Sequence, residues 1–280
     1  MLKSYAFDVD SNLLFTDNAI WLDKWQDGTW IPIEVSQKQH DDMSAEGILK
    51  EKKIYRYLND DVEASMINFR GPDRFETDIF NAINKPDNSG KWPSWEKFIE
   101  ANRYASPIAE ITARWHPVKD LRKTHEKIIL DVLTSSQQED FLGSMQERLW
   151  DYGHSEAFYI QKYLDNNLYA PCSNEEFLAS IGMTIKDPLS DRKNTAFEQF
   201  VLLSKHVFQW YYWAELLKNR KIRMGFSDDV GKNIRGLHQF IDSKEQGIRW
   251  KYPEILFRIY DTWDNLSPAM KISYTNPIKE

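Results

Sequence analysis

Short apolar, β-branched runs alternate along this chain with longer stretches of helical periodicity. Three runs favour strands, and each ends in a polar cluster: residues 3–9, 108–112 and 222–226. Apolar residues recur at helical spacing, or helix-favouring residues gather, in four further segments: 95–102, 121–133, 195–217 and 230–240. Strands that alternate with helices in this way predict an α/β fold with a parallel sheet.

Two long excursions interrupt this alternation. The first begins with aromatic and β-branched runs at 19–25 and 29–35, which flank Asp27-Gly28 and predict a β-hairpin. Residues from about 37 to 88 then look charged and irregular, apart from a weak helix over 75–83. The second excursion, 135–190, is polar and mainly helical in character. Both excursions leave from strand ends, where ligands gather in open α/β sheets.

Composition narrows the class of protein. The chain has 280 residues, 41% of them hydrophobic and 28% charged, which indicates a globular protein with a sizeable core. A net charge of −7 argues against generic binding along a nucleic-acid backbone, although a nucleotide or a strand end stays possible as a small substrate.

Other features bear on the cellular compartment. Cys172 is the one cysteine, so no internal disulfide forms and a reducing compartment is expected. We find no signal-peptide pattern and no apolar run of the ~20 residues that span a bilayer. The sequence therefore predicts a cytoplasmic protein without a membrane partner.

Candidate chemistry concentrates at the strand ends. Asp8 and Asp10 lie two residues apart on an extended segment, so their carboxylates face one side, and one can attack while the other handles a proton. Asp228 and Asp229 stand at a strand-to-helix junction and suit a divalent cation. A solvated turn for the first pair and helix capping for the second are the alternatives.

The second strand ends in Thr112, with Arg114 two residues later. A hydroxyl at a strand end can donate to a phosphate oxygen, and an arginine can bind phosphate through two parallel hydrogen bonds. The alternative is that both are ordinary surface residues.

Four stretches together resemble the signature motifs of the haloacid dehalogenase-like (HAD) superfamily, in the same order. They are Asp8-Val9-Asp10, Ile111-Thr112, Asp191-Arg192-Lys193 and Phe226-Ser227-Asp228-Asp229. The chain departs from the usual first motif at Ser11 and Asn12, where most members carry a small residue followed by Thr or Val. The acid at position 10 favours phosphoryl chemistry, because the halide-releasing branch lacks it.

The resemblance implies a Rossmann-like parallel sheet, a hairpin flap and inserted, mainly helical caps. The core would comprise 1–35, 101–134 and 191–280, with the flap at about 19–35. The inserts would be 36–100 and 135–190, and substrate selection would lie in them.

The resemblance also implies a magnesium-dependent phosphomonoester hydrolase. Asp8 would be the nucleophile that forms an aspartyl-phosphate, and Asp10 the general acid and base. Mg²⁺ would be bound by Asp8, the backbone carbonyl of Asp10 and Asp228, with Asp229 as a ligand or a supporting residue. Thr112 would hold the transferring phosphoryl group.

A lysine would complete the charge balance. Lys193 is the first candidate and Lys205 the alternative. Arg114 and Asn12 are candidates for substrate binding, and the substrate is expected to be a small phosphorylated molecule. A phosphotransferase of the same fold and a non-catalytic HAD-like binding or regulatory protein are the alternative functions, and the oligomeric state is left open.

Overall fold

A computed structural model of the protein describes these residues: 2–10, 12–14, 16, 19–60, 65, 74–92, 94–211, 222–243, 247–262 and 270–273. The chain divides into two compact units. The first comprises Met1–Phe15 and Lys91–Glu280, and the second comprises Thr16–Gly90.

The first unit is built on a mixed sheet of the α/β type. Its described strands lie side by side in the order β6 (Leu168–Pro171), β5 (Ile108–Thr112), β1 (Leu2–Phe7), β7 (Ile222–Asp228), β8 (Ile255–Asp261) and β9 (Met270–Ser273). All neighbours pair in parallel except β8 and β9, which are antiparallel. The predicted α/β fold with a parallel central sheet is therefore confirmed. Because β1 lies between β5 and β7, the carboxyl ends of these three strands meet at one edge.

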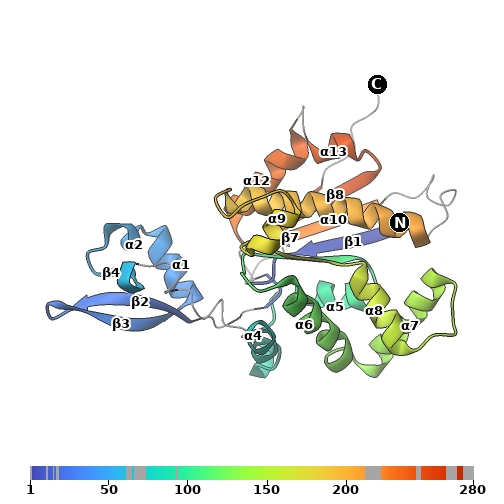
Figure 1. Ribbon diagram of the computed structural model, residues 1–280, viewed down its shortest axis with the longest axis horizontal. Helices are drawn as coiled ribbons and strands as arrows, with labels where there is room; N and C mark the ends of the chain where they lie inside the picture. Colours follow the sequence, from blue (N-terminus) through green and yellow to red (C-terminus); the bar gives the residue numbers. More distant parts are fainter. Residues whose placement is uncertain are drawn as a thin grey trace. The chain divides into compact units, whose positions relative to one another are not determined.

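Helices cover this sheet on both faces (Figure 1). One group consists of α5 (Trp95–Arg103), α6 (Val118–Asp131), α7 (Ser135–Leu149) and α8 (Glu156–Asp165). The other consists of α9 (Glu175–Ser180), α10 (Leu189–Tyr211), α12 (Gly231–Asp242) and α13 (Ile248–Lys251).

The main core lies between the sheet and the second group of helices. Alternate residues of the strands, such as Met224 and Phe257, point into it and meet Phe197 and Phe200 of α10. This alternation is the period of two that a strand imposes on its side chains. On the other face, Phe7 meets Phe98 of α5 edge to face.

The second unit contains a three-stranded antiparallel sheet in the order β3 (Thr29–Ser36), β2 (Ala19–Gln26) and β4 (Tyr55–Tyr57). Asp27 and Gly28 have φ values of 51° and 81°, which is the conformation of a two-residue hairpin turn. The predicted hairpin is present. The remaining described elements are α1 (Gln37–Ala45), α2 (Ile48–Glu51), η1 (Leu58–Asp60), α4 (Arg74–Ile83) and η3 (Pro86–Asn88).

The sequence analysis missed two elements. The stretch expected to be irregular contains α1, which begins with a capping box between Ser36 and Gln39. Its nine residues are almost all polar, so no apolar stripe announced it. The stretch 135–190 is mainly helical, as expected, with α7, α8 and α9, but it also contains β6, an edge strand of the central sheet that the sequence analysis missed. A four-residue strand that ends in proline gives little periodic signal.

The two compact units differ from the predicted core and inserts. The second unit joins the hairpin to residues 36–90, whereas α5, at the end of the first predicted insert, belongs to the first unit. An isolated bridge between Leu14 and Lys91 closes the base of the excursion. The roles of flap and cap remain predictions. None of the described helices combines the length and apolar character needed to cross a bilayer.

Candidate active site

The acidic residues predicted at separate strand ends lie on adjacent strands. Phe7 is in register with Ser227, so Asp8 and Asp228 follow side by side at the carboxyl edge of the sheet. The Asp8 N–H donates to the Ser227 carbonyl at 3.0 Å. Thr112 ends β5, on the other side of β1. The register of a parallel sheet therefore brings together residues that are more than a hundred positions apart in sequence.

Asp8, Asp228 and Asp229 form a group of carboxylates that fits a divalent cation. One oxygen from each lies within 4.8 Å of the others, and Asp8 and Asp228 are buried. Burial raises the pKa of Asp8 well above its usual range, and Asp228 and Asp229 raise it further, against the opposing effect of Lys193. Burial and Asp228 raise the pKa of Asp229 to about 8. Oxygen ligands at this spacing are those that Mg²⁺ prefers.

Lys193, from the beginning of α10, bridges two of these carboxylates. Its Nζ lies 2.9 Å from Asp8 Oδ2 and 2.9 Å from Asp228 Oδ2. Burial alone would lower the pKa of Lys193, but the two carboxylates raise it above its ordinary value. Lys205 instead pairs with Glu254 at 2.6 Å. Of the two lysine candidates, Lys193 is therefore the one that contacts the acidic group.

Further contacts hold Asp228 in place. Its Oδ1 accepts from the Val230 N–H at 2.8 Å, and the Asn233 amide donates to both of its carboxylate oxygens, at 3.2 and 3.1 Å. Sequence reasoning missed Asn233. The available signal was its spacing, because it lies one helical turn beyond Asp229, at the beginning of α12.

Asp10 belongs to a second cluster with Arg114 and Thr112. Arg114 donates through Nη2 to Asp10 Oδ1 at 2.7 Å and through Nε to Asp10 Oδ2 at 2.9 Å, while Thr112 Oγ1 donates to Oδ2 at 3.2 Å. Only 1% of the Arg114 side chain is exposed, against 23% for Asp10. The two predicted phosphate-binding residues therefore hold the predicted general acid and base in a fixed orientation.

Asn12 is used within the fold, and its position gives no support to its predicted role in substrate binding. Its side chain is fully buried, and Nδ2 donates to the carbonyls of Asp8 and Ser227, at 2.8 and 3.2 Å. Its Oδ1 accepts from the hydroxyls of Ser94 at 2.9 Å and Thr262 at 2.7 Å. Asn12 is thus a clamp between the ends of β1 and β7, the two strands that carry Asp8 and Asp228.

Cys172 lies under this site as a packing residue. It is fully buried at the end of β6, and burial raises the pKa of its thiol to about 12. A thiol with so high a pKa is a poor nucleophile, which agrees with the lack of any nucleophile motif around it in the sequence.

Comparisons with protein-family models, with curated proteins and with solved structures found no match to this chain. The function proposed below therefore rests on the site itself.

Proposed function

We propose that this protein is a magnesium-dependent phosphomonoester hydrolase that acts through an aspartyl-phosphate on Asp8. The observation that carries the proposal is the convergence of Asp8, Lys193, Asp228 and Asp229 at the carboxyl edge of the sheet. A nucleophilic carboxylate, a cation beside it and two further acids meet the requirements of phosphoryl transfer to an aspartate.

The chemistry divides between the two clusters. The Asp8 carboxylate attacks phosphorus, and the bond from phosphorus to the leaving oxygen breaks as Asp10 donates a proton to that oxygen. Asp10 then accepts a proton from the water that hydrolyses the aspartyl-phosphate, which frees Asp8 and releases phosphate. Lys193 offsets negative charge on Asp8 and on the phosphoryl oxygens. A Mg²⁺ ion held by Asp8, Asp228 and Asp229 would neutralise charge that otherwise repels the phosphate.

Arg114 and Thr112 orient Asp10 for these two proton transfers. Their hydrogen bonds to its carboxyl group fix the direction in which its oxygens face the leaving group and then the water.

We further propose that residues 16–90 act as a cap with the β2–β3 hairpin as its flap. In support, this unit leaves the core directly after the loop that carries Asp8 and Asp10, and it returns at Lys91, bridged to Leu14. Insertions at such a position exclude water and select the substrate. The motif order that resembles the HAD superfamily supports the same function for a small phosphorylated substrate in the cytoplasm.

The test compares the wild type with Asp8→Asn on p-nitrophenyl phosphate and a panel of natural phosphomonoesters, with Mg²⁺ and with a chelator. We expect Asp8→Asn to lose more than about a thousandfold in kcat while its melting temperature is retained, because an amide cannot attack phosphorus. Asp131→Asn, an exposed aspartate at the end of α6, is the matched control and should be fully active. Turnover by Asp8→Asn near the wild-type rate would contradict the proposal.

A further inference from the structure

The face of the central sheet opposite the main core carries aromatic and basic side chains around a glycine. The strand period places Tyr5 of β1, Gly225 of β7 and Arg258 of β8 in one row across the sheet, pointing away from the core under α10. On the core side, Met224 and Phe257 are at most 1% exposed. On the opposite side, Arg223, Leu256, Arg258 and Tyr260 are partly exposed, whereas Tyr5, Gly225 and Ser227 are buried. Solvent therefore reaches this face over β8 and the start of β7, whereas the core face is buried.

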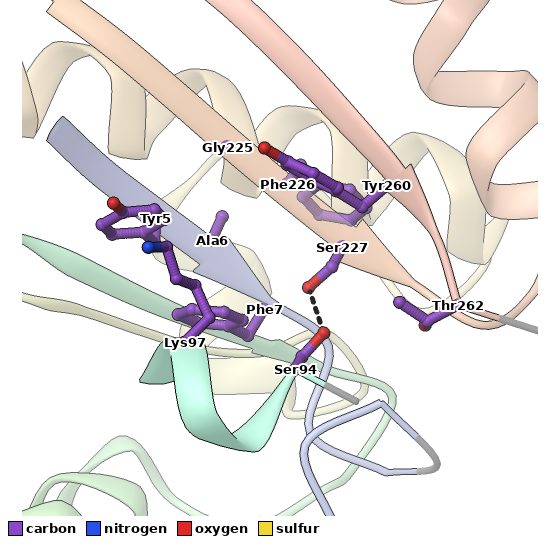
Figure 2. A pocket seen from close by; sticks show the side chains of 10 residues that line it. All are labelled: Tyr5, Ala6, Phe7, Ser94, Lys97, Gly225, Phe226, Ser227, Tyr260 and Thr262. Atoms are coloured by element: carbon purple, nitrogen blue, oxygen red, sulfur yellow. Dashed lines mark hydrogen bonds between the residues drawn. The ribbon is translucent and has the colours of Figure 1, made fainter. Parts of the chain in front are cut away.

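A cavity of about 270 Å³ opens on this face (Figure 2). The rings of Tyr5 and Tyr260 reach it from strands on either side of Gly225. A Cβ atom at position 225 would lie 3.3 Å from Cδ1 of Tyr5 and 3.7 Å from Cε2 of Tyr260. Glycine therefore lets the two rings approach each other above β7, and a gap between two rings suits a flat aromatic ligand.

The carboxyl end of the cavity is closed by hydroxyl groups. Ser94, Ser227 and Thr262 line it there, and the hydroxyl oxygens of Ser94 and Ser227 lie within hydrogen-bond distance, at 3.2 Å (Figure 2). Ser94 and Thr262 also donate to the buried Asn12. These groups form a fixed wall between the cavity and Asp8, so the cavity is separate from the acidic site.

Two arginines lie on the same face, toward the amino ends of the strands. Arg258 is in register with Gly225, and Arg223 lies two residues before Gly225, on the same side of β7. Neither guanidinium makes an ion pair or a side-chain hydrogen bond with another residue of the described ranges, and the Nε of each is buried without a partner there. Lys97, at the edge of the cavity, is already paired with Glu100 at 2.5 Å.

We propose that this face binds a mononucleotide. The base enters the cavity beside Tyr5 and Tyr260, and the phosphate binds Arg223 and Arg258, whose guanidinium groups match phosphate geometry. The cavity alone would suit any flat apolar ring, but two arginines on the same face that pair with no carboxylate of the described residues favour an anion joined to that ring. A nucleic-acid polymer fits less well, because the chain carries a net charge of −7.

Isothermal titration calorimetry tests this site in the full chain. Asp8→Asn protein with a chelator is titrated with AMP, so that turnover and metal binding do not contribute. We expect AMP to bind, and adenosine and inorganic phosphate each to bind at least about tenfold more weakly, since each lacks half of the recognised groups. Arg223→Gln with Arg258→Gln should weaken AMP binding by about tenfold or more, through the loss of charge-assisted hydrogen bonds.

Two further variants distinguish binding at this face from binding elsewhere on the protein. Tyr260→Leu should also weaken AMP binding, because the ring is lost while apolar bulk is kept. Arg122→Gln, which removes a surface ion pair with Asp165 between α6 and α8, should leave it unchanged. The melting temperature of each variant is measured, and only variants that melt at the same temperature as the Asp8→Asn protein are compared.

The proposal is overturned if AMP does not bind at millimolar concentration, or if binding is unaffected by the arginine and tyrosine substitutions. Neither result depends on hydrolysis. The nucleotide site can therefore fail while the phosphohydrolase activity stands, and the reverse also holds.

Discussion

Lys193 is a buried cation between two buried carboxylates. Its substitution should therefore cost more stability than the substitution of an ordinary surface lysine. Lys193→Met leaves Asp8 and Asp228 without this counter-charge. We expect a loss of about 3 kcal/mol in the free energy of unfolding near neutral pH, measured by urea denaturation with a chelator. Added Mg²⁺ should recover part of this loss, because the cation replaces the missing charge.

Lys205→Met is the matched control for that prediction. Its ion pair with Glu254 is partly exposed, and such pairs contribute less than about 1 kcal/mol. Equal losses in the two variants would show that Lys193 has no special electrostatic role in the acidic site.

Asp229 makes the stability of the protein depend on pH. Its pKa is raised from an ordinary 3.8 to about 8, so between these values the folded state binds more protons than the unfolded state. Stability in a chelator should therefore fall as pH rises through this window, and Asp229→Asn should flatten the slope. Mg²⁺ should stabilise the protein more at the upper end of this pH range, where Asp229 is already ionised and loses no proton when the cation binds. Thermal unfolding across the window, with and without Mg²⁺, measures both effects, and an unchanged slope in Asp229→Asn would contradict the assignment.

Asn12 shows how a polar residue in a motif can be structural. Replacement by Leu, which has a similar size, leaves the carbonyl of Asp8 and the hydroxyls of Ser94 and Thr262 without their buried partner. We expect a destabilisation of about 3 kcal/mol, since each buried unsatisfied group carries a penalty. Ser94→Ala removes a single partner and should be milder. If the Asn12→Leu protein were as stable as the wild type, the hydrogen bonds of Asn12 would not be what holds the ends of β1 and β7 together.

At the scale of elements, the helix α1 was not predicted from the sequence, and a substitution at its start tests what stabilises it. It is almost wholly polar, and its start is set by the capping box of Ser36 and Gln39. Ser36→Ala should destabilise the second unit by about 1 kcal/mol, measured by hydrogen exchange of the amides in α1. The capping box of Thr134 at the start of α7 allows the same substitution in the first unit, where exchange in α1 should not change.

The strand ends were predictable because apolar runs followed by acids are local patterns. The convergence of Asp8 and Asp228 follows from the rule that parallel strands share a carboxyl edge. The partner of a lysine is not local information, which is why the sequence could only rank Lys193 ahead of Lys205 without excluding either. The burial of Asn12 depends on the ends of several elements at once, so its motif position gave no sign of it.

The same limit applies to the nucleotide-binding face. No local pattern joins Tyr5 to Arg258, because only the sheet register sets them in one row with Gly225. Sequence reasoning indicated a nucleotide as a possible small substrate, but it offered no residues for a second site. A site formed by side chains from three strands can be identified only when the strand order and register are known.

At the scale of the whole molecule, residues 16–90 form a separate compact unit inserted into the first. Since Leu14 and Lys91 are bridged, a short Gly-Ser linker can replace the insert without stretching the chain. We expect the shortened protein to unfold cooperatively and to hydrolyse p-nitrophenyl phosphate, while its discrimination among natural phosphomonoesters falls. A well-folded deletion that has lost Mg²⁺-dependent hydrolysis of every substrate would show that the insert supplies catalytic groups, contrary to the proposed cap.

The central claim is that Asp8 accepts the phosphoryl group, and the most direct measurement is to find that group on it. Wild-type protein is mixed with substrate and Mg²⁺, quenched in acid during the first turnover and mapped by peptide mass spectrometry. The proposed mechanism predicts one added phosphoryl group on the peptide that contains Asp8, lost when Mg²⁺ is chelated and absent from Asp8→Asn. Rapid phosphate release with the acyl phosphate absent, or with the added group on another residue, would contradict it.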